Sequence, residues 1–379
     1  MTLTDLEERE QAAEALREIE EFAALGIDDL LRTSQAHLQF ALRWGGLTEA
    51  LDGISGVVGL VDQSTDPIVR TGFLQTYGSA LSLSARYAES HEIAERQMTE
   101  AQRLGLEWVT PHALEMRAIA DFGLRHFERA LKTLRRAHHL ASEQGNVHTQ
   151  VNTVVLAARV HLARGSPDRA VQALGDREVR FTSPGMEGEN LATHGLALAC
   201  CGRGDEARNL LDRSDELTSH LEARVLRAFA RSIASHFDDP GGRLDLDLLK
   251  NAAIETIETG NFDGFVCAYR SFPILLGSLA DLQDVDTGPL RRLVHSLDPA
   301  LGETAGLGPA PRERSASTQL LTSREREVLD LVRQGLTNRE IARTLWIAES
   351  TVKAHIRHVF EKLGTRSRTE AAARMLSDS

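Results

Sequence analysis

The stretch AIADFGLRHFERALKTLRRA, residues 118–137, contains the pattern that decides the fold. A small residue, Ala118, is followed twelve positions later by Ala130, and a turn signal lies between them. The same arrangement recurs in ARVHLARGSPDRAVQAL at 158–174 and in GLALACCGRGDEARNLL at 195–211. Two antiparallel helices can cross closely only where both carry small side chains. Each stretch is therefore predicted to form a helical hairpin.

The hairpin pattern repeats along the chain. Its second small position recurs in steps of 40 residues and then of 37, at Ala50, Ser90, Ala130, Ala170 and Ala207. Apolar residues follow at helical spacing. One hairpin cannot bury its apolar face alone, so repeated hairpins must stack on one another. We therefore expect an all-α fold in which residues 1–300 form a superhelix of α-hairpins.

This spacing of a small residue, an alanine and then an apolar residue resembles the tetratricopeptide repeat, although the units here are longer than that family's 34 residues. Additional helices are predicted at residues 4–24, 244–257 and 266–279. Residues 301–319 are rich in Gly, Pro, Ser and Arg without any period, so they are predicted to be a flexible linker. A second domain then follows at residues 320–379.

Charge distinguishes the two predicted domains. The whole chain of 379 residues has a net charge of −12. Residues 320–379 carry 11 Arg and Lys against 8 Asp and Glu, a net of +3, whereas the rest carries 32 against 47, a net of −15. Only the C-terminal part is therefore expected to meet a polyanion. The 39 Arg against 4 Lys are attributed to codon bias in a GC-rich bacterial genome.

Composition excludes several classes of protein. Apolar residues make up 42% and charged residues 26%, which is ordinary for a folded protein. No apolar run is long enough to span a membrane, and the acidic N-terminus does not resemble a signal peptide. Three cysteines (Cys200, Cys201, Cys267) are too few for a disulfide scaffold. We expect a cytoplasmic protein with no membrane partner.

Residues 320–379 predict four short helices. Three capping boxes, in which Ser or Thr precedes Glu by three residues, begin at Thr322, Thr337 and Ser367. The second and third helices are predicted at 338–345 and 350–363, joined by a short turn. On the third helix, Val352, Ile356, Val359 and Leu363 share one face and should enter the core, while the opposite face carries Lys353, Ala354 and Arg357. Two basic side chains one turn apart, beside a small residue, suit the major groove of DNA.

The segments LTSREREVL (321–329), GLTNREIA (335–342), ESTVKAHI (349–356) and KLG (362–364) resemble the LuxR-type, GerE-like helix-turn-helix. The resemblance implies that Lys353, Ala354 and Arg357 read DNA bases. It implies DNA backbone contacts for Asn338, Arg339, Ser350, Thr351 and Arg368. It also implies that the fourth helix pairs two copies through Arg368, Ala371, Ala372 and Met375. Ala348 departs from the family, which commonly has Ser or Thr at that helix cap.

Other kinds of site are not supported by the sequence. No phosphate-binding motif G-x-x-x-x-G-K-[ST] occurs, so the chain is similar to the C-terminal part of large ATP-dependent LuxR regulators without their ATPase. The 14 histidines show no convincing metal-ligand spacing, and no catalytic constellation is recognisable. We expect no catalytic residue, no metal and no cofactor, and therefore not an enzyme.

These observations predict a sequence-specific transcriptional regulator. Its expected partners are double-stranded DNA, bound as a homodimer, and RNA polymerase. A peptide, protein or small-molecule effector is expected in the groove of the helical repeats. One alternative is an interaction adaptor whose C-terminal domain mainly dimerises. Another is a regulator that has lost its ATPase and binds DNA without a signal.

Overall fold

The computed structural model describes residues 3–20, 26–175, 181–282, 285–307, 328–329, 331–332, 336–345, 352–353, 355–357 and 359–360. The chain divides into two compact units, and apart from Asp52–Gly56 the division falls after Ala310. We call the described residues 3–307 the helical body and the described residues 328–360 the C-terminal unit. The described residues form helices and turns without any strand, which confirms the predicted all-α class.

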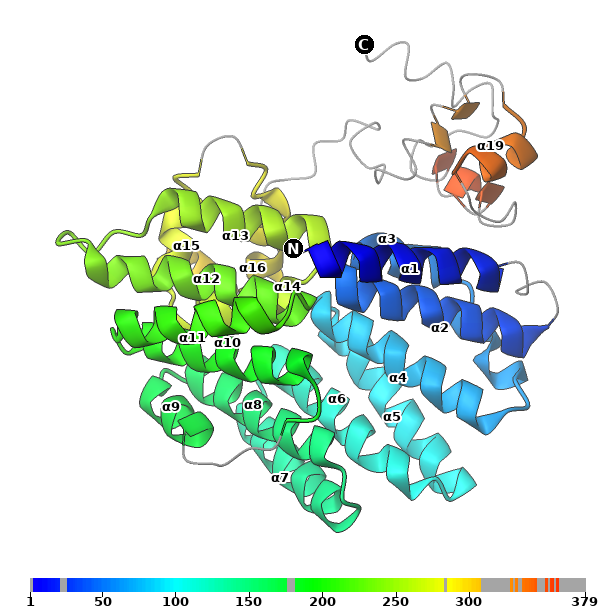
Figure 1. Ribbon diagram of the computed structural model, residues 1–379, viewed down its shortest axis with the longest axis horizontal. Coiled ribbons are helices and arrows are strands. Elements are labelled where there is room, and N and C mark those ends of the chain that lie inside the picture. The colour runs from blue at the N-terminus through cyan, green and yellow to red at the C-terminus, as the bar shows by residue number, and fades with distance from the viewer. Residues whose placement is uncertain are drawn as a thin grey trace. The chain divides into compact units, whose positions relative to one another are not determined.

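The helical body is a succession of helices, drawn from blue to yellow in Figure 1. Two short 3₁₀ turns lie at Val58–Gln63 and Glu107–Val109. The α-helices are α1 (Leu3–Glu20), α2 (Ile27–Trp44), α3 (Leu47–Ile54), α4 (Pro67–Leu83), α5 (Tyr87–Leu104), α6 (Thr110–Gly123), α7 (Phe127–Glu143), α8 (Val147–Ala163), α9 (Pro167–Gly175), α10 (Pro184–Cys200), α11 (Gly204–Leu217), α12 (Leu221–Asp238), α13 (Leu246–Thr259), α14 (Phe262–Ser271), α15 (Ile274–Leu279), α16 (Gly288–Leu297) and α17 (Pro299–Thr304).

Consecutive helices pair into hairpins at the small residues that the repeat predicted. Ala130, Ala170 and Ala207 are fully buried. At the equivalent position of an earlier hairpin, the Ser90 hydroxyl donates a hydrogen bond to the carbonyl of Gly78, twelve residues before it, over 3.2 Å. A Cβ added at Gly195 would lie 2.6 Å from a methyl carbon of Leu211. The small side chains therefore occupy the crossing points of the helices, as expected.

The turn inside each hairpin has the same backbone conformation. The second residue after the first helix adopts a left-handed φ in four successive hairpins, at Ala85 (57°), Arg125 (62°), Gly165 (70°) and Gly202 (74°). These positions lie 40, 40 and 37 residues apart, which matches the period found in the sequence. The left-handed residue ends the first helix and reverses the chain into the second.

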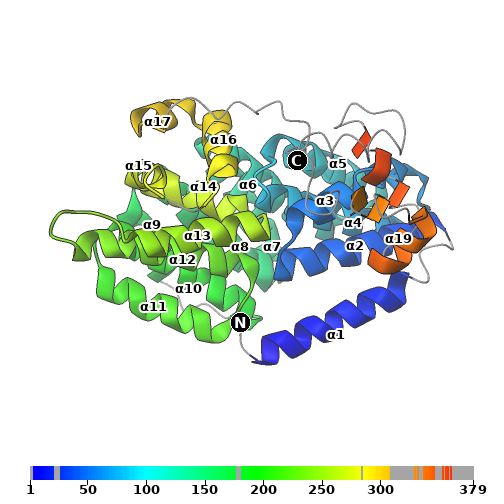
Figure 2. The same cartoon turned by 90° about the horizontal axis from the view of Figure 1, so that it is seen from above.

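The first helices of successive hairpins, α4, α6, α8, α10 and α12, pack directly on one another and form the inner side of the helical body. Helix α14 packs against α4, α8 and α12 (Figures 1 and 2), so part of this inner side is covered by the chain itself. Asp263 of α14 accepts a hydrogen bond from the Tyr87 hydroxyl over 2.7 Å, and its other oxygen lies 3.5 Å from Arg159. Polar groups thus fix α14 in place.

Two sequence expectations need correction near the end of the body. The helix predicted at 266–279 is divided into α14 and α15, because Pro273 cannot continue the hydrogen-bond ladder. The linker predicted at 301–319 begins too early, since residues 301–304 belong to α17. Gly306 then turns the chain with a φ of 71°, and the following Leu307 is fully buried. The rest of the predicted linker, from 308, lies outside the described residues.

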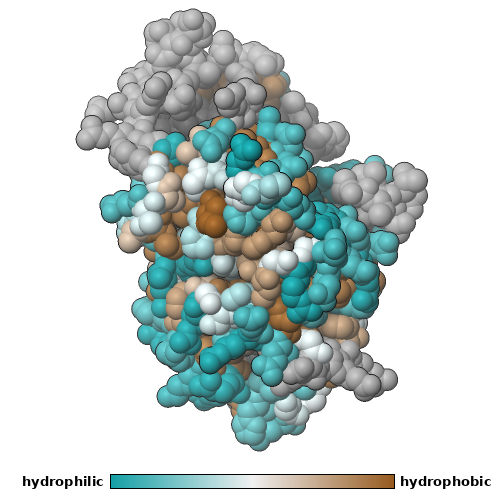
Figure 3. All heavy atoms as spheres, turned by 90° about the vertical axis from the view of Figure 1, so that its left-hand side faces the viewer, coloured by the Kyte–Doolittle hydropathy of each residue, from teal (hydrophilic) through white to brown (hydrophobic). Residues whose placement is uncertain are grey.

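On the face drawn in Figure 3, most side chains of the helical body are hydrophilic, and apolar side chains form patches between them. The searched helices, all within the described residues, include none that is long and apolar enough to cross a membrane.

Candidate nucleic-acid interface

The C-terminal unit has its own small apolar core. Its described members, from three segments of the chain, are Val328, Leu329, Val332, Ile341, Ala342, Val352 and Val359, all buried. Leu331, Leu336, Ile356 and Phe360 pack against this cluster and are partly buried. Burial of Val352 and Val359, one face of the predicted third helix, confirms that this face enters the core. Leu363, the fourth residue expected on it, lies outside the described residues.

Helix α19 (Asn338–Leu345) begins at a complete capping box. The Thr337 hydroxyl accepts a hydrogen bond from the Glu340 backbone N–H over 3.3 Å, and the Glu340 carboxylate accepts from the Thr337 backbone N–H over 2.7 Å. Two unsatisfied N–H groups of the helix end are satisfied by this exchange. The predicted bounds of the second helix, 338–345, agree with α19. The capping boxes at Thr322 and Ser367 lie outside the described residues.

Two of the three predicted base-reading residues, Lys353 and Arg357, lie on the face opposite the core. Residues 352–353, 355–357 and 359–360 are helical, and both Lys353 and Arg357 are exposed. On a helix, residues four apart are neighbours on one surface, so these two cations can contact adjacent groups of a groove. Ala354, between them in the predicted reading set, lies outside the described residues.

The predicted backbone-contacting residues are described only in part. Asn338 and Arg339 are the first two residues of α19; Asn338 is half-buried and Arg339 is exposed. The N-terminus of a helix carries a partial positive charge and suits phosphate groups. Outside the described residues lie Ser350, Thr351 and Arg368, together with the remaining dimerisation residues Ala371, Ala372 and Met375 and the helix cap Ala348.

The described residues of the helical body bear on the sequence expectations for metal sites and reactive thiols. They contain no group of three or more His, Cys, Asp or Glu side chains arranged to hold a metal ion. Burial raises the pKa of the Cys267 thiol to about 12 and also raises the pKa of Cys200, which disfavours the reactive thiolate in both.

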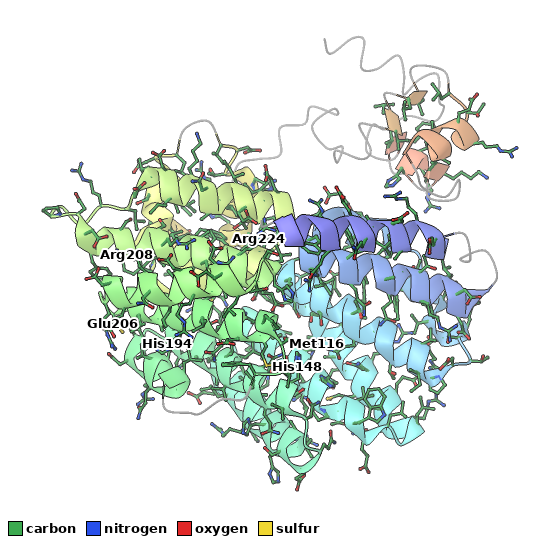
Figure 4. The ribbon with its side chains drawn as sticks, viewed as in Figure 1. Met116, His148, His194, Glu206, Arg208 and Arg224 are labelled. Atoms are coloured by element: carbon green, nitrogen blue, oxygen red, sulfur yellow. The ribbon has the colours of Figure 1, made fainter. Side chains whose placement is uncertain are left out.

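One polar cluster on the inner side of the body was not predicted. The Arg159 guanidinium lies 2.7 Å from Glu189 on α10 and contacts Asp263 on α14. Nearby, Asn152 donates a hydrogen bond to Glu115 on α6 over 3.0 Å. Arg159 is separated along the chain from its two partners by 30 and 104 positions, and Asn152 is separated from Glu115 by 37. No local sequence motif could therefore have indicated the cluster. Figure 4 shows His148, which hydrogen-bonds Asn152, and Met116 on the two neighbouring inner helices α8 and α6.

Comparison with known proteins gives matches of two kinds. The family described as bacterial regulatory proteins, luxR family, matches residues 319–375. The nitrate/nitrite response regulator NarL of Escherichia coli (strain K12) is 45% identical over 80 residues, covering 21% of this chain and 36% of NarL. The spore germination protein GerE of Bacillus subtilis is 47% identical over 60 residues, covering 16% of this chain and 81% of GerE.

A longer alignment joins this chain to the putative HTH-type transcriptional regulator Mb0914c of Mycobacterium bovis, with 26% identity over 375 residues, 95% of this chain and 40% of that protein. The chain thus spans well under half of the length of NarL and of Mb0914c. Among solved structures, the complex of NprR with its cognate peptide NprX aligns with a TM-score of 0.49 and 12% identity, covering 93% of this chain and 97% of that one.

The family match at residues 319–375 agrees with the 47% identity to GerE, of which this chain covers about four-fifths. Together they show that the chain belongs to the luxR family of bacterial regulatory proteins.

Proposed function

We propose that this protein is a sequence-specific DNA-binding transcriptional regulator. Its C-terminal unit binds the major groove as one half of a homodimer on a two-fold site, and its helical body receives an effector or docks a partner, RNA polymerase among the candidates. NarL and Mb0914c are named as regulators, which supports this role over catalysis. The cytoplasm is the compartment in which such a regulator meets DNA.

One observation carries the proposal. Lys353 and Arg357 are exposed on a helix whose opposite face, Val352 and Val359, is buried in the core of the C-terminal unit. A helix held in this way presents its cations outward with a fixed orientation. Arg and Lys side chains so presented can donate to guanine O6 and N7, which is the commonest specific contact in the major groove.

The test measures DNA binding by the full chain. A duplex pool is selected on the wild-type protein, and the affinity for the selected site is compared with that for random DNA. Lys353→Ala and Arg357→Ala are each expected to lower specific affinity by about 1–3 kcal/mol and to relax the sequence preference. Lys132→Ala removes an equal charge from the exposed side of α7 and should leave binding unchanged.

Unchanged affinity in both C-terminal variants would contradict the assignment of the reading face. If the wild-type chain shows no salt-sensitive DNA binding at all, the proposal fails, and the role of an interaction adaptor with a dimerising C-terminal unit becomes the better explanation.

A further inference from the structure

A groove opens on the helical body between α7, α8 and α9, and we call it the α7–α9 groove. Its volume is about 690 Å³, within the range typical of small-molecule sites. The apolar part of its lining consists of Leu131, Leu134, Val154, Ala157 and Ala173. Its titratable lining residues are Arg135, His138, His161 and Arg169.

The α7–α9 groove lies on the outer side of the body. Successive residues of an α-helix are 100° apart, so Asn152 and Arg159 of α8 share one face. Their contacts with Glu115 on α6 and with Asp263 on α14 identify this as the inner face. The groove residues Ala157 and His161 fall on the opposite face of α8. The site is therefore separate from the inner surface of the superhelix.

Apolar surface of α8 forms part of the groove floor. Val154 and Ala157 of α8 are half-buried in the groove, whereas Leu114 and Leu191, which hold the position of Val154 in the neighbouring repeats, are buried. The groove floor therefore includes apolar surface of α8 that a ligand can reach.

Charge in this groove is unbalanced. Among the described residues that line it, four are basic or imidazole side chains and none is acidic. Most described arginines of the helical body form ion pairs, but Arg135 and Arg169 form none with any residue that the structure describes. The groove thus places two cations beside an apolar floor with no carboxylate among its described lining residues.

The preceding repeat shows what is missing beside Arg169. Forty residues earlier, Arg129 occupies the position of Arg169, and Asp121 occupies the position of His161. There the Arg129 guanidinium binds the buried Asp121 carboxylate through contacts of 2.6 and 2.7 Å. In the α7–α9 groove an imidazole, that of His161, holds the position of the carboxylate. Arg169 is therefore a cation without the carboxylate partner that Arg129 has.

The same comparison applies to Arg135. Forty residues earlier its position is held by Glu95, which pairs with Arg117 over 3.1 Å. Ala157 takes the position of Arg117 in the α7–α9 groove. Where the preceding repeat has the Glu95–Arg117 ion pair, this repeat has a cation, Arg135, beside the methyl group of Ala157. The smaller side chain leaves more space in the groove, and the acid is replaced by a positive charge.

The following repeat neutralises its own groove. An equivalent hollow of about 610 Å³ lies between α9, α10 and α11 and is lined by His194 and Glu206, both labelled in Figure 4. Glu206, 37 residues after Arg169, replaces that cation by an acid. It pairs with Arg203, which also lines the hollow, over 2.6 Å. Of these three successive repeats, only the middle one, with the α7–α9 groove, has arginines that no described carboxylate neutralises at these positions.

We propose that the α7–α9 groove binds a small organic anion, a carboxylate attached to an apolar body. The carboxylate lies between Arg169 and His161, where the preceding repeat holds the Asp121 carboxylate, and the apolar body covers the half-buried Val154, Ala157 and Ala173. Arg135 adds a second attraction at the other wall. This inference deepens the proposed function, because it names the chemical class of the effector and its site on the body.

The electrostatics of His161 agree with such a ligand. Burial, followed by the charges of Arg169 on α9 and Arg164 at its own helix end, lowers its pKa, and Glu128 on α7 opposes this. A bound carboxylate would raise the pKa and favour the imidazolium. Binding should then take up a proton and strengthen as the pH is lowered toward the pKa of the free imidazole.

The probe is octanoate, titrated by calorimetry into the full chain without DNA, with octan-1-ol as the neutral analogue. Octanoate is expected to bind saturably and at least tenfold more tightly than the alcohol. Arg169→Gln and Arg135→Gln should each weaken octanoate binding at least fivefold. Arg136→Gln is the matched control, because Arg136 is an exposed arginine of α7 outside the groove lining, and it should bind like wild type.

A second variant recreates the preceding repeat. His161→Asp supplies Arg169 with the carboxylate that Arg129 already has, so it should abolish octanoate binding while retaining the melting temperature. Absence of saturable octanoate binding, equal binding of acid and alcohol, or equal loss in Arg136→Gln and Arg169→Gln would each overturn the proposal. The DNA assays above use no octanoate, so failure of this site and failure of DNA binding are observed separately.

Discussion

Glu115 is the residue whose protonation the fold most clearly disturbs. One of its carboxylate oxygens accepts from Asn152, and the other is buried without a partner among the described residues. Burial is the main cause that raises its pKa to about 8, with a further contribution from the negative charge of Glu189. A carboxyl group with an ordinary value near 4.3 when unfolded is therefore held protonated in the native state around neutral pH.

This makes a prediction about stability and pH. Because the folded pKa is raised, the unfolded state releases the proton first, and the free energy of unfolding should fall as pH rises from about 4.5 to about 8. Glu115→Gln keeps the shape and the acceptor for Asn152 but cannot ionise. The free energy of unfolding of Glu115→Gln minus that of wild type should therefore be about 1–4 kcal/mol larger at pH 8.5 than at pH 5.

Urea denaturation of both proteins at these two pH values measures the difference. Glu92→Gln serves as the control, because Glu92 is an exposed carboxylate on α5. The same pH dependence in wild type and Glu115→Gln would show that this carboxyl group ionises normally in the folded protein.

At the scale of elements, the hairpin turns allow a comparison between glycines. Gly165 has a φ of 70° and nothing within 4 Å of an added Cβ, so a side chain there meets only backbone strain. Gly165→Ala should lower the free energy of unfolding by about 1 kcal/mol. Gly53, the next-to-last residue of α3, also has open space, and its φ is not left-handed. Gly53→Ala should raise stability by about 0.5–1 kcal/mol through helix propensity.

Thermal and urea unfolding of the two variants beside wild type test this pair. The opposite signs are the essential result, since both substitutions add the same methyl group. A loss of stability in Gly53→Ala as large as that in Gly165→Ala would mean that the left-handed turn is not what makes Gly165 costly to replace. Ala85 and Arg125 adopt the same conformation, which shows that the fold tolerates a cost of this size.

Elements defined by local chemistry were predictable from the sequence. The α19 bounds follow from the capping box at Thr337, and the hairpin crossings follow from the spacing of small residues. Helix α14 was predictable as a helix but not in its position, because its polar groups bind distant partners. Asp263 meets Tyr87, 176 positions away, and Arg270 meets the Phe122 carbonyl, 148 positions away. Local periodicity carries no information about such pairs.

The candidate sites divide in the same way. Exposure of Lys353 and Arg357 was expected, because helical spacing places them opposite the apolar Val352 and Val359. The α7–α9 groove was not predicted. The sequence contains the charge changes at Arg169 and Arg135 in register with the repeat, but only the fold shows that both residues line one hollow.

At the scale of the whole molecule, electrostatics predicts how DNA binding responds to salt. Each phosphate neutralised by a Lys or Arg contributes about −0.9 to the slope of log affinity against log salt. Arg339, exposed at the start of α19, is proposed to contact the DNA backbone and not a base. Arg339→Ala should therefore weaken specific and random DNA by the same factor and reduce the slope by about one unit per bound copy.

Titrations of the full chain at four salt concentrations give the affinities for specific and random DNA and their dependence on salt. Lys353→Ala provides the contrast, because it should lose more affinity for the specific site than for random DNA. A loss in Arg339→Ala confined to the specific site would move this residue into the reading face.

The charge of the helical body affects this result. Residues outside 320–379 carry a net charge of −15, so the molecule as a whole repels DNA, and attraction must come from cations within about 10 Å of the phosphates, the screening length near 0.1 M salt. With a net charge of only +3 in residues 320–379, each cation of the interface is a large fraction of that attraction, which is why one arginine should change the slope measurably.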